Sequence, residues 1–382
     1  MEQTVYASQL NSLLKWLHSH PELSFQERQT TQRIRQELES AGVEVLDSNL
    51  ETGLVACIRG ALPGPVIALR CDIDALPITE ESNLSYASTT TGCMHACGHD
   101  FHTAVMVGAA WLLQQIRSAL AGTVKVIFQP GEEVAQGAPR VIETGLLEDV
   151  KLYLGIHSYP GFSSGTLGIK EGPVMAAVDR FAITLTGRGA HGAQPHKGID
   201  PVVVQAALVQ SLQALVSRTL DPFTPAVLSV THVEAGNTWN VIPQSAYLEG
   251  TVRTLSAQAR RLLETGLRRM AAEVSAAYGA QATVEWFQGP PAVINDAALC
   301  SLARKTATEM GFAVDRQEDT MGGEDFSCYL RKAPGIFIRV GTGGGYPGHH
   351  PKFTVDPAAL EPAARYFAAL AQACLAACGD QK

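Results

Sequence analysis

The chain has 382 residues, of which 46% are hydrophobic and 17% charged, and its formal net charge is −8. Single hydrophobic cores stop growing at roughly 250–300 residues, so this length predicts two domains. A nucleic acid or an acidic membrane surface would favour a protein with clustered positive charge. The acidic balance therefore argues against both as partners.

The first residues lack the charged start, the continuous apolar run and the small-residue cleavage site of a signal peptide. No stretch approaches the roughly 20 apolar residues of a membrane span. The eight cysteines are scattered along the chain, which suits free thiols in a reducing compartment better than a disulfide framework. We therefore expect a cytoplasmic protein, in which a cysteine among histidines is a candidate metal ligand or nucleophile.

The amino-terminal third predicts helices first and then strands that alternate with helices. Residues 9–42 repeat apolar side chains at helical spacing, with Pro21 dividing the pattern into two helices and Gly42 ending the second. The elements expected next are two β-rich runs, a buried helix and two apolar strands, at residues 53–60, 65–74, 101–116, 122–129 and 152–159. This alternation predicts an α/β domain with a mostly parallel, mixed sheet flanked by helices.

The pattern changes near residue 179. Residues 179–290 read as strand, helix, strand, strand, helix and strand, which is the βαββαβ plan of a ferredoxin-like domain. After residue 291, helix and strand alternate again, as though the chain rejoins the first sheet. We therefore expect a catalytic domain formed by residues 1–178 and 291–382, with residues 179–290 inserted as a lid or dimerisation domain.

The stretch TGCMHACGHDFHTA, residues 91–104, concentrates two cysteines, three histidines and an aspartate. A small structural zinc knot is one interpretation, but closed zinc sites usually pair their ligands as two separated hooks, and this stretch runs directly into an apolar helix. Further candidate ligands lie in three other predicted loops: adjacent Glu132 and Glu133, then His157, then adjacent His349 and His350. Four such clusters on one α/β domain indicate a shared site, because functional residues of these sheets gather at the carboxyl ends of the strands.

The sequence resembles the metal-dependent amidohydrolases that include hippurate hydrolase, N-acyl-amino-acid deacylases and plant auxin–amino-acid conjugate hydrolases, which are relatives of the zinc aminoacylases and dipeptidases. The resemblance covers nearly the whole chain. It rests on eight motifs in order: HPELSFQE, ALRCDIDALPI, HACGHDFHTA, FQPGEE, GRGAHGAQPHKGIDP, NVIPQSAYLEGTVRT, GGEDFS and HHPKFTVD.

The resemblance implies a centre of two divalent metal ions with five protein ligands: Cys97, His99, Glu133, His157 and His349. The family pattern His-x-Pro selects His349 over His350. Thiolate, imidazole and carboxylate together suit zinc or another first-row divalent ion; the carboxylate leaves manganese open, with nickel or cobalt as further candidates. Within the same stretch, Cys93 and His95 are expected to be structural. Asp100, His102 and Asp74 are expected to support the ligands.

The resemblance also implies the catalytic and substrate-binding groups. Glu132 is the expected general base, which later protonates the leaving amine. His191 is expected to polarise the substrate carbonyl, often across a dimer in the partner's site, while Asn240 and Arg253 are expected to bind the substrate's carboxylate. We therefore expect a homodimer formed through the inserted domain, which could pair further into a tetramer.

The expected activity is hydrolysis of the amide bond in N-acyl amino acids, with an N-acetyl, N-benzoyl or related group, to a carboxylic acid and a free amino acid. Two alternatives remain at this point. One is a carboxypeptidase or dipeptidase acting on short peptides. The other is a metal- or amino-acid-binding protein without catalysis, against which the intact Glu132 and the complete ligand set argue.

Overall fold

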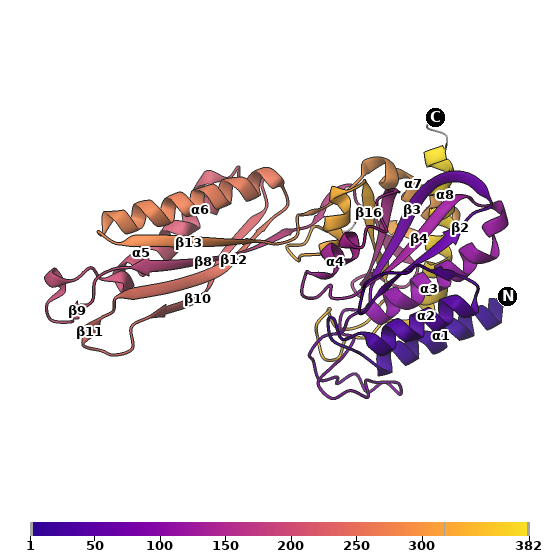
Figure 1. The fold of residues 1–382 in the computed structure, drawn as a ribbon, viewed down its shortest axis with the longest axis horizontal. Coiled ribbons are helices and arrows are strands. Elements are labelled where there is room, and N and C mark those ends of the chain that lie inside the picture. Colours follow the sequence, from indigo (N-terminus) through magenta and orange to yellow (C-terminus); the bar gives the residue numbers. More distant parts are fainter. Residues whose placement is uncertain (1–2, 317, 380–382) are drawn as a thin grey trace. The chain divides into compact units, whose positions relative to one another are not determined.

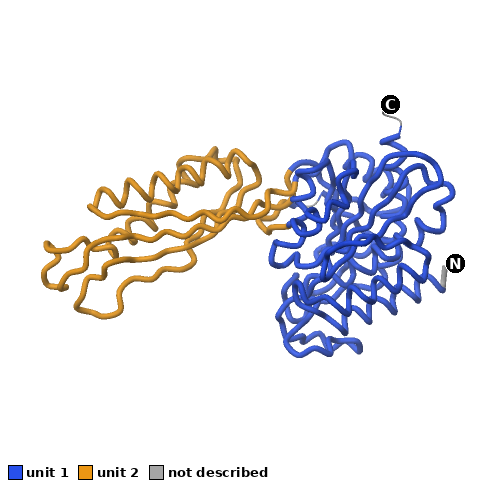
Figure 2. The backbone as a smooth tube through the Cα atoms, viewed as in Figure 1, with its two compact units in different colours: residues 1–172, 294–318, 325–382 blue, residues 173–293, 319–324 orange. Residues whose placement is uncertain are grey.

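The computed structural model describes residues 3–316 and 318–379. The chain divides into two compact units, drawn in different colours in Figure 2. Unit 1 comprises residues 1–172, 294–318 and 325–382, and unit 2 comprises residues 173–293 and 319–324. Each unit has its own hydrophobic core. The short return of residues 319–324 to unit 2 is a feature that the sequence patterns did not suggest.

Unit 1 is built on an eight-stranded mixed sheet (Figure 1). Its strands, in their order across the sheet, are β1 (Glu44–Val45), β2 (Leu54–Arg59), β4 (Ala121–Gln129), β3 (Leu62–Asp72), β5 (Val150–Tyr159), β16 (Gly335–Gly341), β6 (Thr166–Gly168) and β15 (Ala313–Asp315). The central strands β4, β3, β5 and β16 run parallel to one another. Their carboxyl ends therefore meet at one edge of the sheet.

The helices of unit 1 are α1 (Gln3–Ser19), α2 (Arg28–Ser40), α3 (His99–Gln115), α4 (Gly137–Glu143), α7 (Ala297–Glu309) and α8 (Leu360–Gly379). Short 3₁₀ turns are η1 (Arg117–Ala119), η4 (Asp325–Arg331) and η5 (Pro357–Ala359). Helices α3 and α8 pack on the sheet and on each other, α1 packs on α3, and α7 packs on α8. The apolar composition of α3 reflects this position, because its residues from His99 to Trp111 are all buried.

The predicted buried helix is α3, which begins two residues before the predicted start. The division of the amino-terminal pattern at Pro21 is also confirmed. However, the break is wide, because residues 20–27 lie between α1 and α2 and belong to neither. Helix α4 and the short strands β6 and β15 were not predicted, since each is too brief for a periodic pattern to register.

Unit 2 contains a four-stranded antiparallel sheet in the order β10 (Ala226–Ala235), β12 (Ser245–Thr254), β8 (Ala177–Thr186) and β13 (Gln281–Gln288). Its helices are α5 (Pro201–Ala214), extended by a π turn η3 (Leu215–Thr219), and α6 (Ala257–Ala277). Apolar residues of both helices and of the strands form one core. The βαββαβ order is the predicted one, so the predicted fold class, an α/β domain with an inserted ferredoxin-like domain, is confirmed.

Shorter elements complete the fold. In unit 2, β9 (Ala190–His191) pairs with β11 (Val241–Ile242), and the turn η2 (Pro195–Lys197) follows β9. Strands β7 (Gly172–Met175) and β14 (Val293–Asn295) pair where the chain enters and leaves unit 2. Among the residues that the structure describes, no helix is long and apolar enough to cross a membrane.

Candidate metal centre

The candidate ligands of unit 1 lie at the carboxyl ends of its parallel strands. Glu132 and Glu133 follow β4, His157 lies near the end of β5, and His349 lies in the loop after β16. Cys97 and His99 flank Gly98, which has a φ of +88° and precedes the first turn of α3. A Cβ atom on Gly98 would lie 2.4 Å from Oγ of Ser158, so only glycine lets this segment approach β5 so closely.

The side chains of these residues converge. Sγ of Cys97 lies 3.6 Å from Nε2 of His157, and Nε2 of His349 lies 3.5 Å from Oε1 of Glu133. Nε2 of His99 lies 3.8 Å from the same Glu133 oxygen. Two groups of three potential ligand atoms, each within 4.8 Å of one another, have Cys97 in common: Cys97, His99 and His157 form one, and Cys97, Glu133 and His349 form the other. The structure thus brings together all five predicted ligands.

Two atoms of this cluster are buried without a hydrogen-bond partner among the described residues: Nε2 of His99 and Oε1 of Glu133. Buried polar atoms nearly always have a partner, so each exception needs an explanation. The contacts around them, at 3.5 Å or more, are too long for good hydrogen bonds but leave room for an ion between the groups. The donor set of thiol, imidazole and carboxylate therefore fits a first-row divalent metal ion.

Backbone and carboxylate groups behind the cluster hold two of its imidazoles with Nε2 directed inward. Nδ1 of His99 lies 2.9 Å from the carbonyl oxygen of Asp74 and donates to it. Nδ1 of His157 donates to the carbonyl oxygen of Ser158 at 2.7 Å. Metal-binding histidines usually donate their second ring nitrogen in this way, which fixes the tautomer. Both rings therefore have the orientation that metal binding requires.

The electrostatics of the cluster favour a cation. Burial raises the pKa of the Cys97 thiol to about 12, so a thiolate there requires a positive charge beside it. Burial lowers the pKa of His157 to about 3, which leaves a neutral imidazole able to bind a metal. Burial alone would also lower the pKa of His99, but Asp72, Cys97 and Asp74 together outweigh it and raise this pKa well above its usual range. The surroundings that hold a proton on His99 would equally stabilise a metal ion.

His102 lies beside the cluster but has no free nitrogen. Its Nδ1 donates to Oδ1 of Asp72 at 2.6 Å, and its Nε2 accepts from the backbone N–H of Ser158 at 2.6 Å. Asp72 also accepts from Arg70, whose guanidinium donates to Asp325 as well. This fully buried chain reaches from η4 to the residue next to His157, so its position is compatible with the supporting role expected for His102.

Sequence reasoning missed Arg70 and Asp325 as members of this network. Both lie in motifs of the family, ALRCDIDALPI and GGEDFS, so the motifs were the available signal. The motifs did not reveal the roles of the two residues, because Arg70 and Asp325 pair across 255 positions of the chain.

Four neighbours of the ligands belong to neither group of three. Sγ of Cys93 donates to the carbonyl oxygen of Pro21, and His95 is buried with neither ring nitrogen hydrogen-bonded to a described residue. The carboxylate of Asp100 accepts from Nδ1 of His18 at 2.8 Å. The ring of His350 stacks on Tyr346 with centroids 4.4 Å apart, while His349 adopts a φ of +66° and reaches Glu133.

Glu132 lies beside the ligands, with Oε2 4.0 Å from Nε2 of His99. Its side chain is 12% exposed, so the carboxylate borders the cluster and still meets solvent. Such a carboxylate is suited to exchange protons with a bound water molecule.

The three predicted residues of unit 2 lie at two ends of its sheet. His191 on β9 pairs with Val241 on β11, and the N–H of Gly192 donates to the carbonyl oxygen of Asn240, so His191 and Asn240 are neighbours. Strand β11 of this pair immediately precedes the Ser245 end of β12, whereas Arg253 lies at the other end of β12, opposite Val178. Eight residues of extended chain separate the two ends, which is roughly 25 Å.

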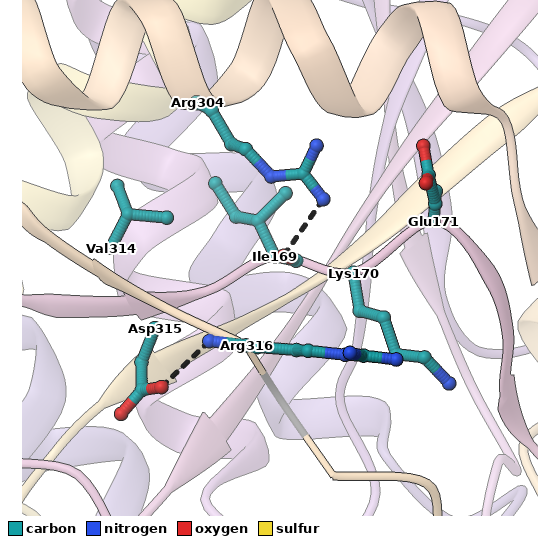
Figure 3. Close-up of a pocket in the computed structure, with 7 residues that line it drawn as sticks. All are labelled: Ile169, Lys170, Glu171, Arg304, Val314, Asp315 and Arg316. Carbon is teal, nitrogen blue, oxygen red and sulfur yellow. Dashed lines mark hydrogen bonds between the residues drawn. The ribbon is translucent and has the colours of Figure 1, made fainter.

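One cavity of unit 1 has a different character (Figure 3). Its volume is about 420 Å³, and it is lined by Ile169, Lys170, Glu171, Arg304, Val314, Asp315 and Arg316. Arg304 donates to the carbonyl oxygen of Ile169 at 3.3 Å, as the dashed line shows. The lining contains no thiol or imidazole, so this cavity is not a second candidate for the metal centre.

A mixed α/β sheet whose strand ends gather a thiol, three imidazoles and two carboxylates defines the class of metal-dependent hydrolases. Residues 68–373 match the model of Peptidase family M20/M25/M40, and the chain belongs to that family. It is 48% identical to the N-acetylcysteine deacetylase of Bacillus subtilis strain 168 over 97% of this chain and 98% of that protein. It is also 41% identical to the N-acyl-L-amino acid amidohydrolase of Geobacillus stearothermophilus, over 73% of this chain and 76% of that one.

A solved structure supports the assignment of the chain to this family. The crystal structure of the Bacillus subtilis YXEP protein, described as a dinuclear metal-binding peptidase of the M20 family, superposes with a TM-score of 0.90. The two chains are 46% identical, and the match covers 98% of this chain and 99% of that one.

Proposed function

We propose that the protein is a dinuclear metal-dependent amidohydrolase that removes the acyl group from N-acyl amino acids. The observation that carries this proposal is the pair of ligand groups that share Cys97, with buried polar atoms of His99 and Glu133 that have no hydrogen-bond partner among the described residues. The close relatives named for deacylation of N-acetylcysteine and of N-acyl-L-amino acids support the substrate class.

The residues that would hold the ions are Cys97, His99, Glu133, His157 and His349. Cys97 belongs to both groups of three, so its thiol would be a ligand whichever group holds an ion. Bound divalent ions supply two effects, a lowered pKa for the attacking water and stabilisation of the charge that develops on the carbonyl oxygen. We propose zinc or manganese as the metal, with nickel or cobalt as alternatives that the same donors accept.

Glu132 would act as the general base and acid. Its carboxylate takes a proton from the attacking water and passes it to the nitrogen of the leaving amino acid. The division of labour between the neighbouring glutamates is supported by their contacts: Oε1 of Glu133 lies 3.5 Å from Nε2 of His349 and belongs to a group with Cys97, while Glu132 belongs to neither group that contains Cys97.

The residues of unit 2 would bind the substrate. Arg253 is half-buried, and its planar guanidinium can hold a carboxylate through two parallel hydrogen bonds. The two ends of β12 lie roughly 25 Å apart, which supports the proposal that His191 and Asn240 serve a different substrate molecule from Arg253 of their own chain. A homodimer joined through unit 2 resolves this, because His191 and Asn240 can then reach the partner's substrate.

The experiment that tests the function measures free amino acid released from N-acetyl, N-benzoyl and indole-acyl amino acids and from dipeptides. Each substrate is tested before chelation, after chelation and after return of metal. The proposal predicts release from acyl amino acids that chelation abolishes and metal restores. If no free amino acid is released from any of these substrates, the result would contradict the proposal and favour a binding protein.

A second candidate, hydrolysis of short peptides, is favoured by the family's peptidases and by the description of the YXEP protein as a peptidase. The same panel separates the two. Cleavage of dipeptides alone would replace the proposed function with this one.

A further inference from the structure

The segment between α1 and α2, residues 20–27, carries the motif HPELSFQE, for which the proposed chemistry gives no role. It is an irregular segment, and Phe25 within it has a φ of +63°. A bulky residue with positive φ is strained, and such strain persists where surrounding contacts require it. The contacts of residues 24–27 therefore indicate what the strain serves.

Glu27 turns its carboxylate away from its own helix. It is the residue before α2, where a side chain usually caps the first N–H groups, but it makes no such bond. The carboxylate of Glu22 takes that role instead, since it accepts from the N–H groups of Gln29 and Thr30. Glu27 is fully buried, and its Oε1 accepts from the N–H of Gly131 at 2.9 Å.

Phe25 contacts the same glycine with its ring. A Cβ atom on Gly131 would lie 2.4 Å from Cζ and 2.5 Å from Cε1 of Phe25, so the ring occupies the place where any other residue would have a side chain. Gly131 also has a φ of +62°, which glycine alone adopts without strain. The centroid of the Phe25 ring also lies 3.7 Å from Cζ of Arg140 on α4.

Ser24 makes a third connection. Its hydroxyl donates to Oδ2 of Asp74 at 2.7 Å, and that oxygen also accepts from the backbone N–H of Glu133 at 3.0 Å. Residues 24–27 therefore contact the turn at both sides of Glu132: at Gly131 through Phe25 and Glu27, and at Glu133 through Asp74.

We propose that Phe25 and Glu27 are positioning residues that fix the turn of residues 131–133 and thereby set the direction of the Glu132 and Glu133 carboxylates. The inference rests on the proposed function for its catalytic consequence. The expected effect on the turn is independent of that function, because residues 131–133 should become more mobile when either contact is removed, whatever the protein hydrolyses. A displacement of about 1 Å at a reacting group can lower turnover by about a hundredfold.

The test compares Glu27→Met with Glu27→Gln. Both keep the length of the side chain, but only glutamine keeps an oxygen that can accept from Gly131. We expect Glu27→Met to speed amide hydrogen exchange of the segment 129–136 by about tenfold or more and to weaken binding of Zn²⁺, measured by competition with a chelator. We expect its kcat to fall by about ten- to a hundredfold with KM changed less than about threefold. Glu27→Gln should stay close to the wild type in all three measurements.

A double-mutant cycle tests Phe25 and remains informative if Glu27→Met fails to fold. Gly131→Ala should lower the protection from hydrogen exchange and the affinity for Zn²⁺, because the new methyl group clashes with the ring of Phe25. Phe25→Ala should relieve part of that loss when the two changes are combined.

Phe312→Ala, which removes a similarly half-buried ring far along the sequence, is the matched control. Strictly additive effects in the cycle, or equal exchange of residues 129–136 in Glu27→Met and Glu27→Gln, would overturn the inference. If Gly131→Ala and Phe25→Ala are non-additive as expected but the wild type hydrolyses no substrate of the panel, the proposed function is wrong and the structural inference stands.

Discussion

His18 provides the most quantitative prediction. It lies near the end of α1, is 3% exposed, and contacts two buried carboxylates: Asp100 at 2.8 Å through Nδ1 and Glu80 at 3.1 Å through Nε2. Burial alone would lower the pKa of His18, but hydrogen bonds with Asp100 and Glu80 outweigh it and raise this pKa to about 10. A charged imidazole therefore joins α1, the loop of residues 80–88 and the first turn of α3.

Glutamine at position 18 would keep a hydrogen-bonding group but remove the charge. Asp100 and Glu80 would then remain buried without a cation, and breaking a buried ion pair by removing one partner costs about 3–5 kcal/mol. The change in pKa from 6.5 to about 10 gives a similar figure, about 5 kcal/mol at roughly 1.4 kcal/mol for each pH unit. We therefore expect His18→Gln to lower the free energy of unfolding of unit 1 by about 3 kcal/mol or more at pH 6.5.

The pH dependence has a definite sign. Because the folded pKa of His18 lies above the unfolded one, the native state binds the additional proton, and its stabilisation is fully present below pH 6.5. That stabilisation is lost as the pH rises through about 10. The stability difference between the wild type and His18→Gln should therefore shrink steadily between pH 6.5 and 10.

The assay is urea unfolding followed by tryptophan fluorescence at fixed metal concentration. Trp16 and Trp111 lie in unit 1, so a background with Trp239→Phe and Trp286→Phe reports on unit 1 alone. His232 offers a matched control for the ion pairs, since it lies 3.1 Å from both Glu234 and Glu249 but is exposed on unit 2. His232→Gln, followed with the tryptophans of unit 2, should cost less than about 1 kcal/mol. Equal losses from both histidine variants, or a loss for His18→Gln that is independent of pH, would refute the reasoning.

Four further predictions concern the site and its assembly. Glu132→Gln should keep the metal content yet lower kcat by about a hundred- to ten-thousandfold, and metal analysis beside turnover would show whether it does. Cys97→Ala should bind less metal, so a normal metal content in that variant would remove Cys97 from the ligands. Mixing Glu132→Gln chains with His191→Ala chains should restore part of the activity through hybrid dimers, and no recovery after proven subunit exchange would place His191 in its own chain's site. Arg253→Ala should penalise substrates with a free carboxylate more than the corresponding amides, and equal losses on both would argue against carboxylate binding.

The sequence predicted the elements whose patterns are long and repetitive. Helix α3 was recognisable because its burial requires an almost continuous apolar composition, and the order of elements in unit 2 followed from the periodicity of 2 and of 3.6 residues. The candidate ligands were recognisable for a different reason. Cysteine, histidine and glutamate are chemically distinctive, and parallel strands bring their carboxyl ends together whatever the loops do.

The remaining features depend on contacts between distant residues, which no local pattern records. Pro21 predicted a break between helices but not that Phe25 would adopt a positive φ with its ring against Gly131, a residue more than a hundred positions away. The resemblance implied that His102 supports the ligands, but it did not name the groups that His102 contacts. Only the positions of Asp72 and of the Ser158 N–H show that both its nitrogens are engaged.

The central claim is that the cluster around Cys97 performs metal-dependent hydrolysis. The most direct measurement titrates Zn²⁺ or Mn²⁺ into chelator-treated protein while following the release of free cysteine from N-acetylcysteine, a substrate chosen for the deacetylase relative. The account predicts that activity returns with added metal and saturates at two ions per chain. Full activity after exhaustive chelation, or a Cys97→Ala variant with the same titration curve, would contradict it.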